Sequence, residues 1–553
     1  MLNFISGVEK RKIKFFIQKI AEKFKLKDHF YKIIIKPSQL IALYKIRKIS
    51  KNTKEKTSIK NGKKIIFNSI DARYMIHTYT EAGLAKALEM RGHDVKMLIC
   101  DGIFKTCVGH YNIKKPPTKW RCENCKKFSK KFYKEANVKF SPYREYISNE
   151  RIKKIREKVK KLSYKECLEQ IYKEVEVGFN AKTSADRYFV GLEPDKKTYE
   201  YMLREELVNS IITTDVAEEV VKRDKPDILV TSHGCYSHWG SFSDYFLKNG
   251  IKVHVWFTGY KGNTITFDKH LINQQFKSYY ESIRNKKALN GNEEKTLDEF
   301  LKRRMKGKEG DTAFYEFSNG NKDLEKKFEI EKYDSNYFIF PNVPWDRSIL
   351  FLDEKVAFKD VYKWISYTIE LFKKQKNKQL VIKIHPAESK TNKSEKTMLD
   401  YILEKHKKLP NNIKIIPPDT DISPYSFFKM MDVGIVCNGT IGLEMAVQNI
   451  PVIVTGNVHY SKKGFTHDVV SPEEYLKKIE NNILPLNNQQ KLAKIYAYFF
   501  FIKSFIPRKF IYYRNFLNLG WDISSFDDLS VGKDKHLDHL CECISTDKLY
   551  QDW

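Results

Sequence analysis

The sequence predicts an α/β protein in which two doubly wound, parallel sheets follow each other along the chain. Short apolar runs alternate with helical patterns from residue 64 to residue 257, and the same alternation returns from residue 337 to residue 454. Such alternation is typical of parallel sheets covered by helices. The chain has 553 residues, more than one hydrophobic core usually supports, and 41% of them are hydrophobic. The composition therefore favours two or more domains and excludes a disordered chain.

The first set of elements begins with a short apolar strand. Strands are predicted over residues 64–68, 95–99, 227–231 and 253–257. Helices are predicted over residues 81–91, 152–175, 199–222 and 243–248. Gly92 ends the first of these helices, as glycine often does.

The second set follows the polar, charged residues 270–330. Its strands are predicted over residues 337–340, 380–384, 413–416, 433–436 and 452–454, with helices over residues 356–374 and 441–448 among them. The aromatic-rich residues 490–517 are predicted to be helical. Residues 496–513 within them form either a buried helix that crosses back to the first domain or a patch that touches lipid headgroups. We divide the chain into residues 1–60 (basic extension and linker), 61–330 (first domain), 331–485 (second domain) and 486–553 (crossing helices and tail).

The chain is strongly basic, with 100 Lys and Arg residues against 69 Asp and Glu residues and a formal charge of +31. This excess indicates an anionic partner, or else a biased coding composition rich in lysine. Ile13, Phe16 and Ile20 recur at helical spacing between lysines, so the N-terminal helix either lies on an anionic bilayer or packs against the body.

The chain is expected to be cytoplasmic and peripheral on the inner face of the membrane. No stretch reaches the roughly 18 uncharged apolar residues that a membrane-spanning helix needs. The N-terminal apolar residues precede the basic ones, which is the reverse of a secretory signal.

Polar residues follow two strands of the second domain at their carboxyl ends. His385-Pro386 follows one strand, and Asn438-Gly439-Thr440 follows another and opens a helix. Ligands of open α/β sheets bind outside the carboxyl ends of strands, and a helix N-terminus suits phosphate. Each motif alone is also common in plain turns and helix caps, so the prediction depends on their combination.

The residue types suggest a role for each position. His385 can donate a proton or hydrogen bond to a phosphate oxygen. Gly439 allows close approach of the backbone, and Thr440 adds a hydroxyl donor. Glu444, one turn into the helix, can accept from ribose hydroxyls.

These residues resemble the bacterial capsule polysaccharide synthesis family, which includes Kdo transferases and shares its His-Pro and Ser/Thr motifs with bacterial polysialyltransferases. The resemblance covers about residues 335–480. Besides the motifs named above, residues 451–456, Tyr460 and residues 464–466 carry it. It implies a GT-B fold, with two Rossmann-type domains facing a cleft. The cysteines of this chain predict a cysteine-containing insertion in the first domain. It also implies that His385 contacts the donor phosphate and that Asn438, Gly439, Thr440 and Glu444 line the nucleotide site.

The resemblance has two limits. The family commonly has Ser-Ser/Thr-Thr where this chain has Asn438-Gly439-Thr440, so the donor is not identified. The front half also resembles surface-glycan glycosyltransferases, through residues 100–102, 233–236 and 256–260, but this assigns no catalytic residue.

The candidate acid and base groups follow the first strand. Glycosyl transfer needs a base for the acceptor hydroxyl, or a nucleophile if the anomeric configuration is retained. Asp71 is the first candidate and Glu81 the second, with His77 between them. Alternatively, Asp71 pairs with Arg73 and Glu81 only caps the helix.

Two further positions follow strands. His233 ends another strand of the first domain and is either a site residue or a satisfied loop histidine. Asn342, Trp345 and Asp346 follow the first strand of the second domain and either contact the donor or hold the interdomain hinge.

Cys100, Cys107, Cys122 and Cys125 form a cluster that ends in Cys-x-x-Cys. Four thiolates suit a structural zinc ion without an open position, and reduced, unligated thiols are the alternative. No catalytic metal is predicted, because Asp419-Thr420-Asp421 is better explained as a turn or helix cap.

The function that these features favour is a membrane-peripheral glycosyltransferase of capsule-type polysaccharide synthesis. It would transfer a sugar from a nucleotide-activated donor, CMP-linked by resemblance, to a glycan or lipid-linked acceptor. A polyol-phosphate transferase of the teichoic-acid type, a nucleic-acid-binding protein and a non-catalytic scaffold are the alternatives. No aromatic-basic recognition motif is found, so nucleic acid is not an expected partner.

Overall fold

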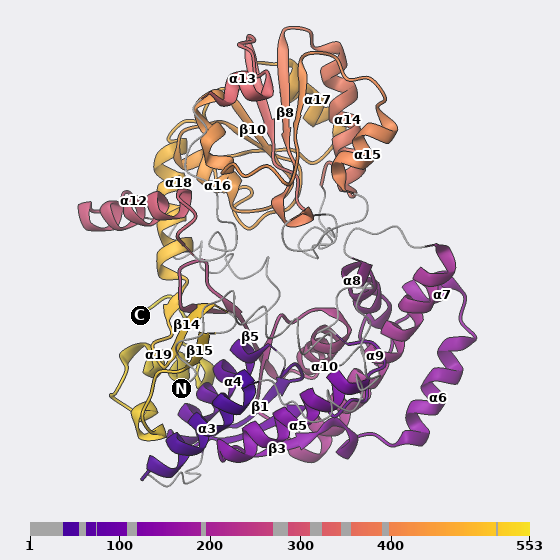
Figure 1. Cartoon of the computed structure of the whole chain (residues 1–553), viewed down its shortest axis with the longest axis vertical. Helices are drawn as coiled ribbons and strands as arrows, with labels where there is room; N and C mark the ends of the chain where they lie inside the picture. Colours follow the sequence, from indigo (N-terminus) through magenta and orange to yellow (C-terminus); the bar gives the residue numbers. More distant parts are fainter. Residues whose placement is uncertain are drawn as a thin grey trace, which may run out of the picture.

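The computed structural model describes residues 37–54, 62–72, 74–107, 119–189, 195–268, 286–309, 323–343, 356–389, 397–515 and 518–553. The N-terminal helix predicted around residues 13–20 lies outside these ranges. In the described part the chain forms two α/β units, which are the lower and upper lobes of Figure 1. The predicted α/β class with two largely parallel sheets is therefore confirmed.

The first unit contains a seven-stranded sheet in the order β13-β6-β5-β4-β1-β2-β3. Its strands are β1 (Lys64–Ser69), β2 (Asp94–Ile99), β3 (Phe140–Pro142), β4 (Ile228–Ser232), β5 (Lys252–Thr258), β6 (Thr264–Asp268) and β13 (Ile506–Pro507). The five strands from β5 to β3 pair in parallel, whereas β6 and β13 add antiparallel strands at one edge. The four predicted strands are confirmed, and the sequence missed β3, β6 and β13.

Two hydrophobic cores cover the two faces of this sheet. Successive strand residues point to opposite faces, so Ile65 and Phe67 enter one core and Ile66 enters the other. The helices are α3 (Pro37–Asn52), α4 (Met75–Met90), α5 (Lys119–Glu135), α6 (Asn149–Lys160), α7 (Tyr164–Leu168), α8 (Val177–Phe189), α9 (Lys196–Asp224) and α10 (Ser241–Lys248). The helix predicted over residues 152–175 is wrong in its extent, because α6 ends at Lys160 and α7 begins after an N-cap of its own, Ser163, and ends at Leu168.

The second unit contains a six-stranded parallel sheet in the order β12-β11-β10-β7-β8-β9. Its strands are β7 (Ser335–Ile339), β8 (Lys378–Lys383), β9 (Ile413–Ile416), β10 (Val433–Val436), β11 (Val452–Val454) and β12 (His467–Asp468). Its helices include α14 (Val361–Lys374), α15 (Met398–Lys405), α16 (Ile441–Val447) and α17 (Pro472–Glu480). The five predicted strands are confirmed.

The helices that lie between β6 and β7 in the chain pack against the second unit. The sequence instead placed residues up to 330 in the first domain. These helices include α12 (Gly291–Met305) and α13 (Leu324–Phe328). Leu297, Phe300 and Leu301 of α12 are buried in one core with Phe338 of β7. Their spacing forms one apolar helix face, which explains why a segment so polar overall still docks on the sheet.

The C-terminal segment runs from the second unit back to the first, along one side of the molecule (Figure 1). It contains α18 (Gln489–Tyr498), a wide helical turn (Phe499–Lys503), β13, the hairpin β14 (Ile511–Asn515) and β15 (Asn518–Trp521), and α19 (Lys535–Ser545). The helix predicted over residues 490–517 is therefore wrong beyond Lys503. Pro507 cannot donate a helical hydrogen bond, and it sits on an edge strand, where proline is tolerated.

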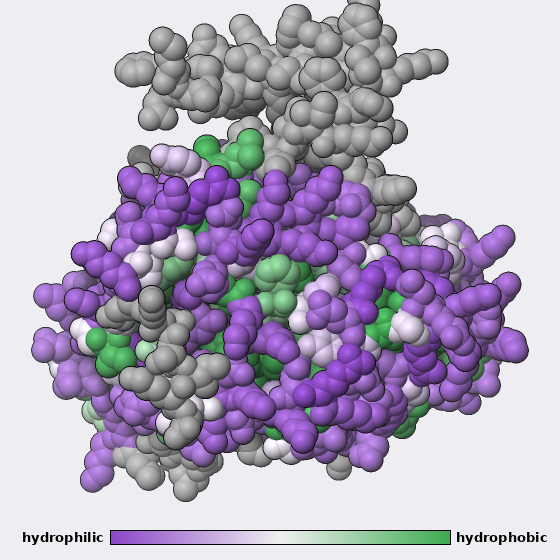
Figure 2. Space-filling model, turned by 90° about the horizontal axis from the view of Figure 1, so that it is seen from below, coloured by the Kyte–Doolittle hydropathy of each residue, from purple (hydrophilic) through white to green (hydrophobic). Residues whose placement is uncertain are grey.

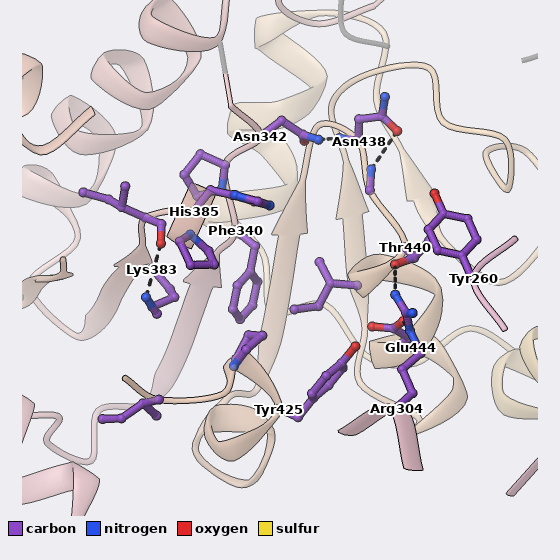
Figure 3. Close-up of a pocket in the computed structure, with 17 residues that line it drawn as sticks. Tyr260, Arg304, Phe340, Asn342, Lys383, His385, Tyr425, Asn438, Thr440 and Glu444 are labelled. Carbon is purple, nitrogen blue, oxygen red and sulfur yellow. Dashed lines mark hydrogen bonds and ion pairs between the residues drawn. The ribbon is translucent and has the colours of Figure 1, made fainter. Parts of the chain in front are cut away.

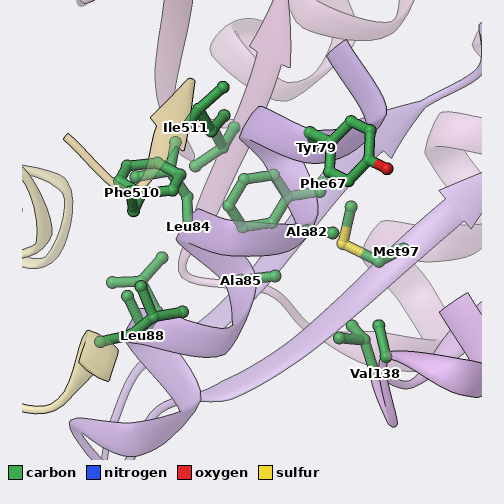
Figure 4. Close-up of a cluster of buried hydrophobic side chains, with 14 of the residues drawn as sticks. Phe67, Tyr79, Ala82, Leu84, Ala85, Leu88, Met97, Val138, Phe510 and Ile511 are labelled. Carbon is green, nitrogen blue, oxygen red and sulfur yellow. The ribbon is translucent and has the colours of Figure 1, made fainter. Parts of the chain in front are cut away.

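The returning segment completes the first core. Phe510 and Ile511 pack beside Leu84 and Leu88 of α4 (Figure 4). The indole N–H of Trp521 donates to the carbonyl oxygen of Tyr79, 2.8 Å away. A Cβ on Gly83 would lie 2.6 Å from the Phe510 ring, so the absence of a side chain there allows this contact.

One face of the molecule is mainly hydrophilic. Figure 2 looks at the face below the first unit, where most described side chains are hydrophilic. No helix in the described ranges is long and apolar enough to cross a membrane.

We expect Phe510→Ala to lower the free energy of unfolding of the first unit by about 3–5 kcal/mol, because it leaves a cavity between the returning segment and α4. Urea denaturation followed by tryptophan fluorescence measures this change. Leu484→Ala is the control, because Leu484 is 74% exposed and its truncation should change the free energy by less than about 0.5 kcal/mol. Equal effects of the two substitutions would contradict the packing described here.

Candidate active site

The carboxyl ends of β7, β8 and β10 meet at one place in the second unit. The chain proceeds from β7 to β8 and β9 on one side, then returns to β10 on the other side of β7. Such a reversal of strand order leaves a crevice in which ligands bind. A cavity of about 260 Å³ lies there, and it is lined by residues that follow all three strands (Figure 3).

The predicted donor-site residues all line this cavity. They are His385, Asn438, Gly439, Thr440 and Glu444, joined by Asn342. Trp345 and Asp346, predicted beside Asn342, lie outside the described residues. The structure thus brings together residues that are about 100 positions apart in the sequence.

The turn after β10 is held by its own polar groups. The backbone N–H of Asn438 donates to Oδ1 of Asn342 at 3.1 Å, and that of Gly439 donates to Oδ1 of Asn438 at 2.7 Å. Gly439 has φ +96°, a conformation that favours glycine. The hydroxyl of Tyr460 donates to the carbonyl oxygen of Gly439 at 2.8 Å. The backbone N–H groups of Asn438 and Gly439, at the helix N-terminus where a phosphate was expected, therefore already have acceptors within the protein.

A buried ion pair closes one side of the cavity. Nε of Arg304, at the end of α12, donates to Oε1 of Glu444 at 2.6 Å, and Nη2 donates to Oγ1 of Thr440 at 3.0 Å. Arg304 is 2% exposed and Glu444 is 1% exposed. The guanidinium also lies over the rings of Tyr260 and Phe501, with its Cζ 5.3 and 5.2 Å from their centroids.

This geometry does not support the predicted contact of Glu444 with ribose hydroxyls. One carboxylate oxygen of Glu444 accepts from Arg304, and the side chain is almost completely buried. A buried carboxylate is stable when it is paired with a cation. Glu444 therefore positions Arg304 at the cavity.

His385 lies at the opposite side of the cavity, near Asn342 (Figure 3). Its Nδ1 accepts a hydrogen bond from the backbone N–H of Ala387 at 3.1 Å. In the neutral ring Nδ1 therefore carries no proton, and Nε2 carries it. The ring is thus fixed in the tautomer that can donate from Nε2.

Among the residues with polar side chains that line the cavity, the sequence did not predict Tyr260, Arg304, Lys383 and Tyr425. Lys383 is 3% exposed and donates to the carbonyl oxygens of Ile384 and Pro417, so its charge is turned toward the backbone. Arg304 had a signal in the sequence, because it continues the apolar face of α12 at the spacing Leu297, Leu301, Arg304.

A second polar cluster lies at the strand reversal of the first sheet, between β1 and β4. Asp71 follows β1, and Glu81 is on α4. Both are buried, and Oε1 of Glu81 accepts from the indole N–H of Trp256 at 3.0 Å. Burial raises the pKa of Glu81 to about 8, and the nearby charge of Asp71 adds to this, while hydrogen bonds from Ser69 and Trp256 oppose it.

Two histidines belong to the same cluster. The rings of His77 and His233 have centroids 5.3 Å apart, and His77 meets the edge of Trp256 at 5.0 Å. His233 has φ +61° and Gly234 has φ +54°, so the chain makes a left-handed turn after β4. Asp71, His77, Glu81 and His233 are thus gathered as the sequence suggested, whereas Arg73, the alternative partner of Asp71, lies outside the described residues.

The four clustered cysteines lie around the carboxyl end of β2 and on α5. Cys122 and Cys125 are on α5. A Cβ on Gly102 would lie 3.0 Å from Sγ of Cys122, so the turn after β2 packs closely against α5. Within the described ranges no group of three or more His, Cys, Asp or Glu side chains is arranged to hold a metal ion. Residues 108–118 of this module are outside those ranges, and structural zinc stays a prediction.

A segment of the sequence that includes most of the second unit matches a known family model. Residues 243–497 match the family model of the capsule polysaccharide biosynthesis protein. The matched segment includes every residue that lines the cavity, and it begins and ends beyond the predicted range of 335–480. The predicted resemblance to capsule polysaccharide synthesis proteins is therefore confirmed for this segment, whereas Asp71, His77, Glu81 and His233 precede it.

Solved structures similar to this chain include two transferases. The β-Kdo 2,7 transferase of Thermosulfurimonas dismutans KpsC is 15% identical, with 51% of this chain and 79% of that chain covered and a TM-score of 0.31. The β-Kdo 2,4 transferase of the same protein is 11% identical, with 49% and 79% covered and a TM-score of 0.34. The UDP co-structure of S. aureus MnaA is 13% identical, with 79% and 91% covered and a TM-score of 0.27. No curated protein sequence is significantly similar to the chain.

We expect Arg304→Met and Glu444→Leu each to lower the free energy of unfolding of the second unit by about 3–5 kcal/mol, because each leaves one buried charge unpaired. The double variant should recover most of this loss, since it removes both charges. A double-mutant cycle measured by chemical denaturation checks the coupling. The exposed pair Lys494–Glu294 is the control, with an expected coupling below about 1 kcal/mol.

The raised pKa of Glu81 predicts a pH-dependent stability. The folded state holds the proton of Glu81 more tightly than the unfolded state, so this stabilisation is complete below pH 4.5 and is lost as the pH rises to about 8. Across this pH window, the free energy of unfolding of the wild type should fall by a few kcal/mol relative to that of Glu81→Gln. The expected change is on the order of 1.4 kcal/mol per unit of pKa shift. Unfolding free energies of the two proteins between pH 5 and pH 8 measure it, and a constant difference would show that Glu81 titrates normally.

Proposed function

We propose that this protein is a glycosyltransferase of surface-polysaccharide synthesis that binds a nucleotide-activated sugar in the cavity of the second unit. The observation that carries the proposal is the cavity at the strand reversal between β7 and β10, with His385 on one side and the Arg304–Glu444 pair on the other. The match to the capsule polysaccharide biosynthesis family over residues 243–497 supports it.

The cavity residues suit the departure of a nucleotide. When the bond between the sugar carbon and the donor phosphate breaks, its electron pair stays on the phosphate oxygen. A donor from Nε2 of His385 stabilises that oxygen, because a hydrogen bond to a developing charge is stronger in the transition state than in the ground state. Arg304, held by Glu444, adds fixed N–H groups and a positive charge on the other side.

The first unit would activate the acceptor. Transfer forms a bond between the acceptor oxygen and the sugar carbon, and the acceptor hydroxyl gives its proton to a base. Glu81, with a pKa of about 8, is largely protonated at neutral pH and is a poor base there. Asp71 is therefore our first candidate for the base, with Glu81 as its neutral neighbour.

The nature of the donor is a finer part of the proposal. The resemblance suggests a CMP-linked sugar. A CDP-linked donor would instead favour a polyol-phosphate transferase of the teichoic-acid type.

Association with an anionic membrane surface also belongs to the proposal. On α3, Leu40, Ile41 and Tyr44 are more than half exposed. Lys48 and Lys51 of the same helix are also exposed. Basic and apolar side chains together on one helix suit an anionic bilayer surface.

The deciding experiment is thermal unfolding with CMP, CDP, UDP and GDP. A ligand that binds only the folded state must raise the unfolding midpoint. We expect one of these nucleotides to raise it for the wild type, and we expect His385→Ala to lose at least tenfold in affinity for that nucleotide.

His93→Ala is the matched control, because His93 precedes β2 at the amino end of the first sheet and should leave the nucleotide response unchanged. If no nucleotide shifts the midpoint, the transferase proposal fails. Strong, salt-dependent binding of RNA in its place would favour the nucleic-acid alternative.

A further inference from the structure

Arg508 is the second buried arginine among the described residues, and its environment differs from that of Arg304. The side chain of Arg508 is 0% exposed. Nη1 donates to Oγ1 of Thr80 on α4 at 2.7 Å, whereas Nε and Nη2 have no hydrogen-bond partner in the part of the chain that the structure describes. Arg304, by comparison, places its Nε against a carboxylate.

The charge of Arg508 is present but not neutralised. Burial lowers the pKa of Arg508 to about 10, which still leaves it protonated at neutral pH. The neighbour that acts on it electrostatically is the phenol of Tyr513, not a carboxylate. An unpaired buried charge is costly, so proteins retain one where a ligand or a reaction uses it.

The two nitrogens without partners form one edge of the guanidinium. Nε–H and Nη2–H point in the same direction and match the two oxygens of a carboxylate or phosphate. Nη1, which Thr80 already holds, is the third nitrogen of the group. The contact with Thr80 therefore orients the guanidinium, and its bidentate edge is buried without a partner among the described residues.

Arg508 adjoins the polar cluster at the strand reversal of the first sheet. Its charge acts on His77, which faces His233 across 5.3 Å. Both histidines are partly exposed, unlike Arg508, so the cluster reaches the surface through them. The left-handed backbone of His233 and Gly234 lies at the same place, and such strained backbone is concentrated at functional sites.

We propose that Arg508, oriented by Thr80 and close to His77, binds an anionic group, a carboxylate or a phosphate, on the molecule that the first unit accepts. That this molecule is the sugar acceptor depends on the proposed function, whereas the anion site itself does not. The acceptor class would then be an acidic or phosphorylated glycan, with its charge held by Arg508 and its hydroxyl near Asp71. Arg508 is a binding residue in this arrangement, and it takes no part in bond formation.

The test compares the full-length wild type with Arg508→Met and Arg508→Lys. The probes are glucuronate, glucose 6-phosphate and neutral glucose at constant ionic strength, and binding is measured by calorimetry and by the unfolding midpoint. We expect one or both anionic sugars, but not glucose, to bind the wild type. Arg508→Met should weaken that binding at least tenfold, and Arg508→Lys should give an intermediate loss because lysine keeps the charge without the bidentate edge.

The ligand-free stability separates binding from a structural role. Without ligand, Arg508→Met should unfold at the same midpoint as the wild type or higher, because it removes an unpaired buried charge. A lower midpoint together with unchanged anion binding would overturn the proposal. If Arg508→Met does not fold, full anion affinity in Arg508→Lys would overturn it as well. Arg223→Met is the control for loss of a surface charge, because Arg223 is 53% exposed.

The anionic probes also distinguish this inference from the proposed function. Preference for glucuronate identifies a carboxylate, and preference for glucose 6-phosphate identifies a phosphate. Anion binding that depends on Arg508, in a protein that binds no nucleotide, would support this site and refute the donor site. Nucleotide binding with no response to either anionic sugar would do the reverse.

Discussion

The buried pair Arg304–Glu444 is the interaction on which the arrangement of the second unit depends. It joins the end of α12 to the helix that follows β10, across 140 positions of sequence. The same guanidinium lies over Tyr260, which follows β5 of the first sheet, and over Phe501, at the start of the return to the first unit. Both charges are out of contact with water, so each is stable only while the other is in place. One ion pair thus joins α12, the second sheet and the returning segment around the cavity.

The two buried arginines divide structural and binding roles between them. Arg304 is paired with a carboxylate of the protein itself, that of Glu444. It forms one side of the cavity of the second unit and provides fixed hydrogen-bond donors there. Arg508 has a hydroxyl partner and an unused edge at the strand reversal of the first unit. Each sheet therefore has a polar site where its strand order reverses, which is where open α/β sheets bind ligands.

Local patterns explain most of what the sequence predicted. The nine predicted strands appear because each is a short apolar run whose two faces are both covered, and such runs are recognisable without knowledge of their partners. Strands β3, β12 and β13 were missed because each is very short and lies at the edge of its sheet. The sequence also missed β6 and the hairpin strands β14 and β15. The prediction of a helix beyond Lys503 was wrong because aromatic residues occur in strand hairpins as well as in helices. Pro507 disfavours the helix there.

The sequence alone determined the α/β class, the strand ends at His385 and Asn438, and the resemblance to capsule polysaccharide synthesis proteins, because each depends on residues close together in the chain. Only the tertiary structure decided that Glu444 holds Arg304, that α12 packs with the second unit, and that Arg508 lies beneath α4 beside His77. The contacts of Arg304 with Glu444 and of Arg508 with Thr80 join residues separated by more than 100 positions. A local pattern could indicate that Arg304 faces the core, but the partner of a buried charge is a property of the folded chain.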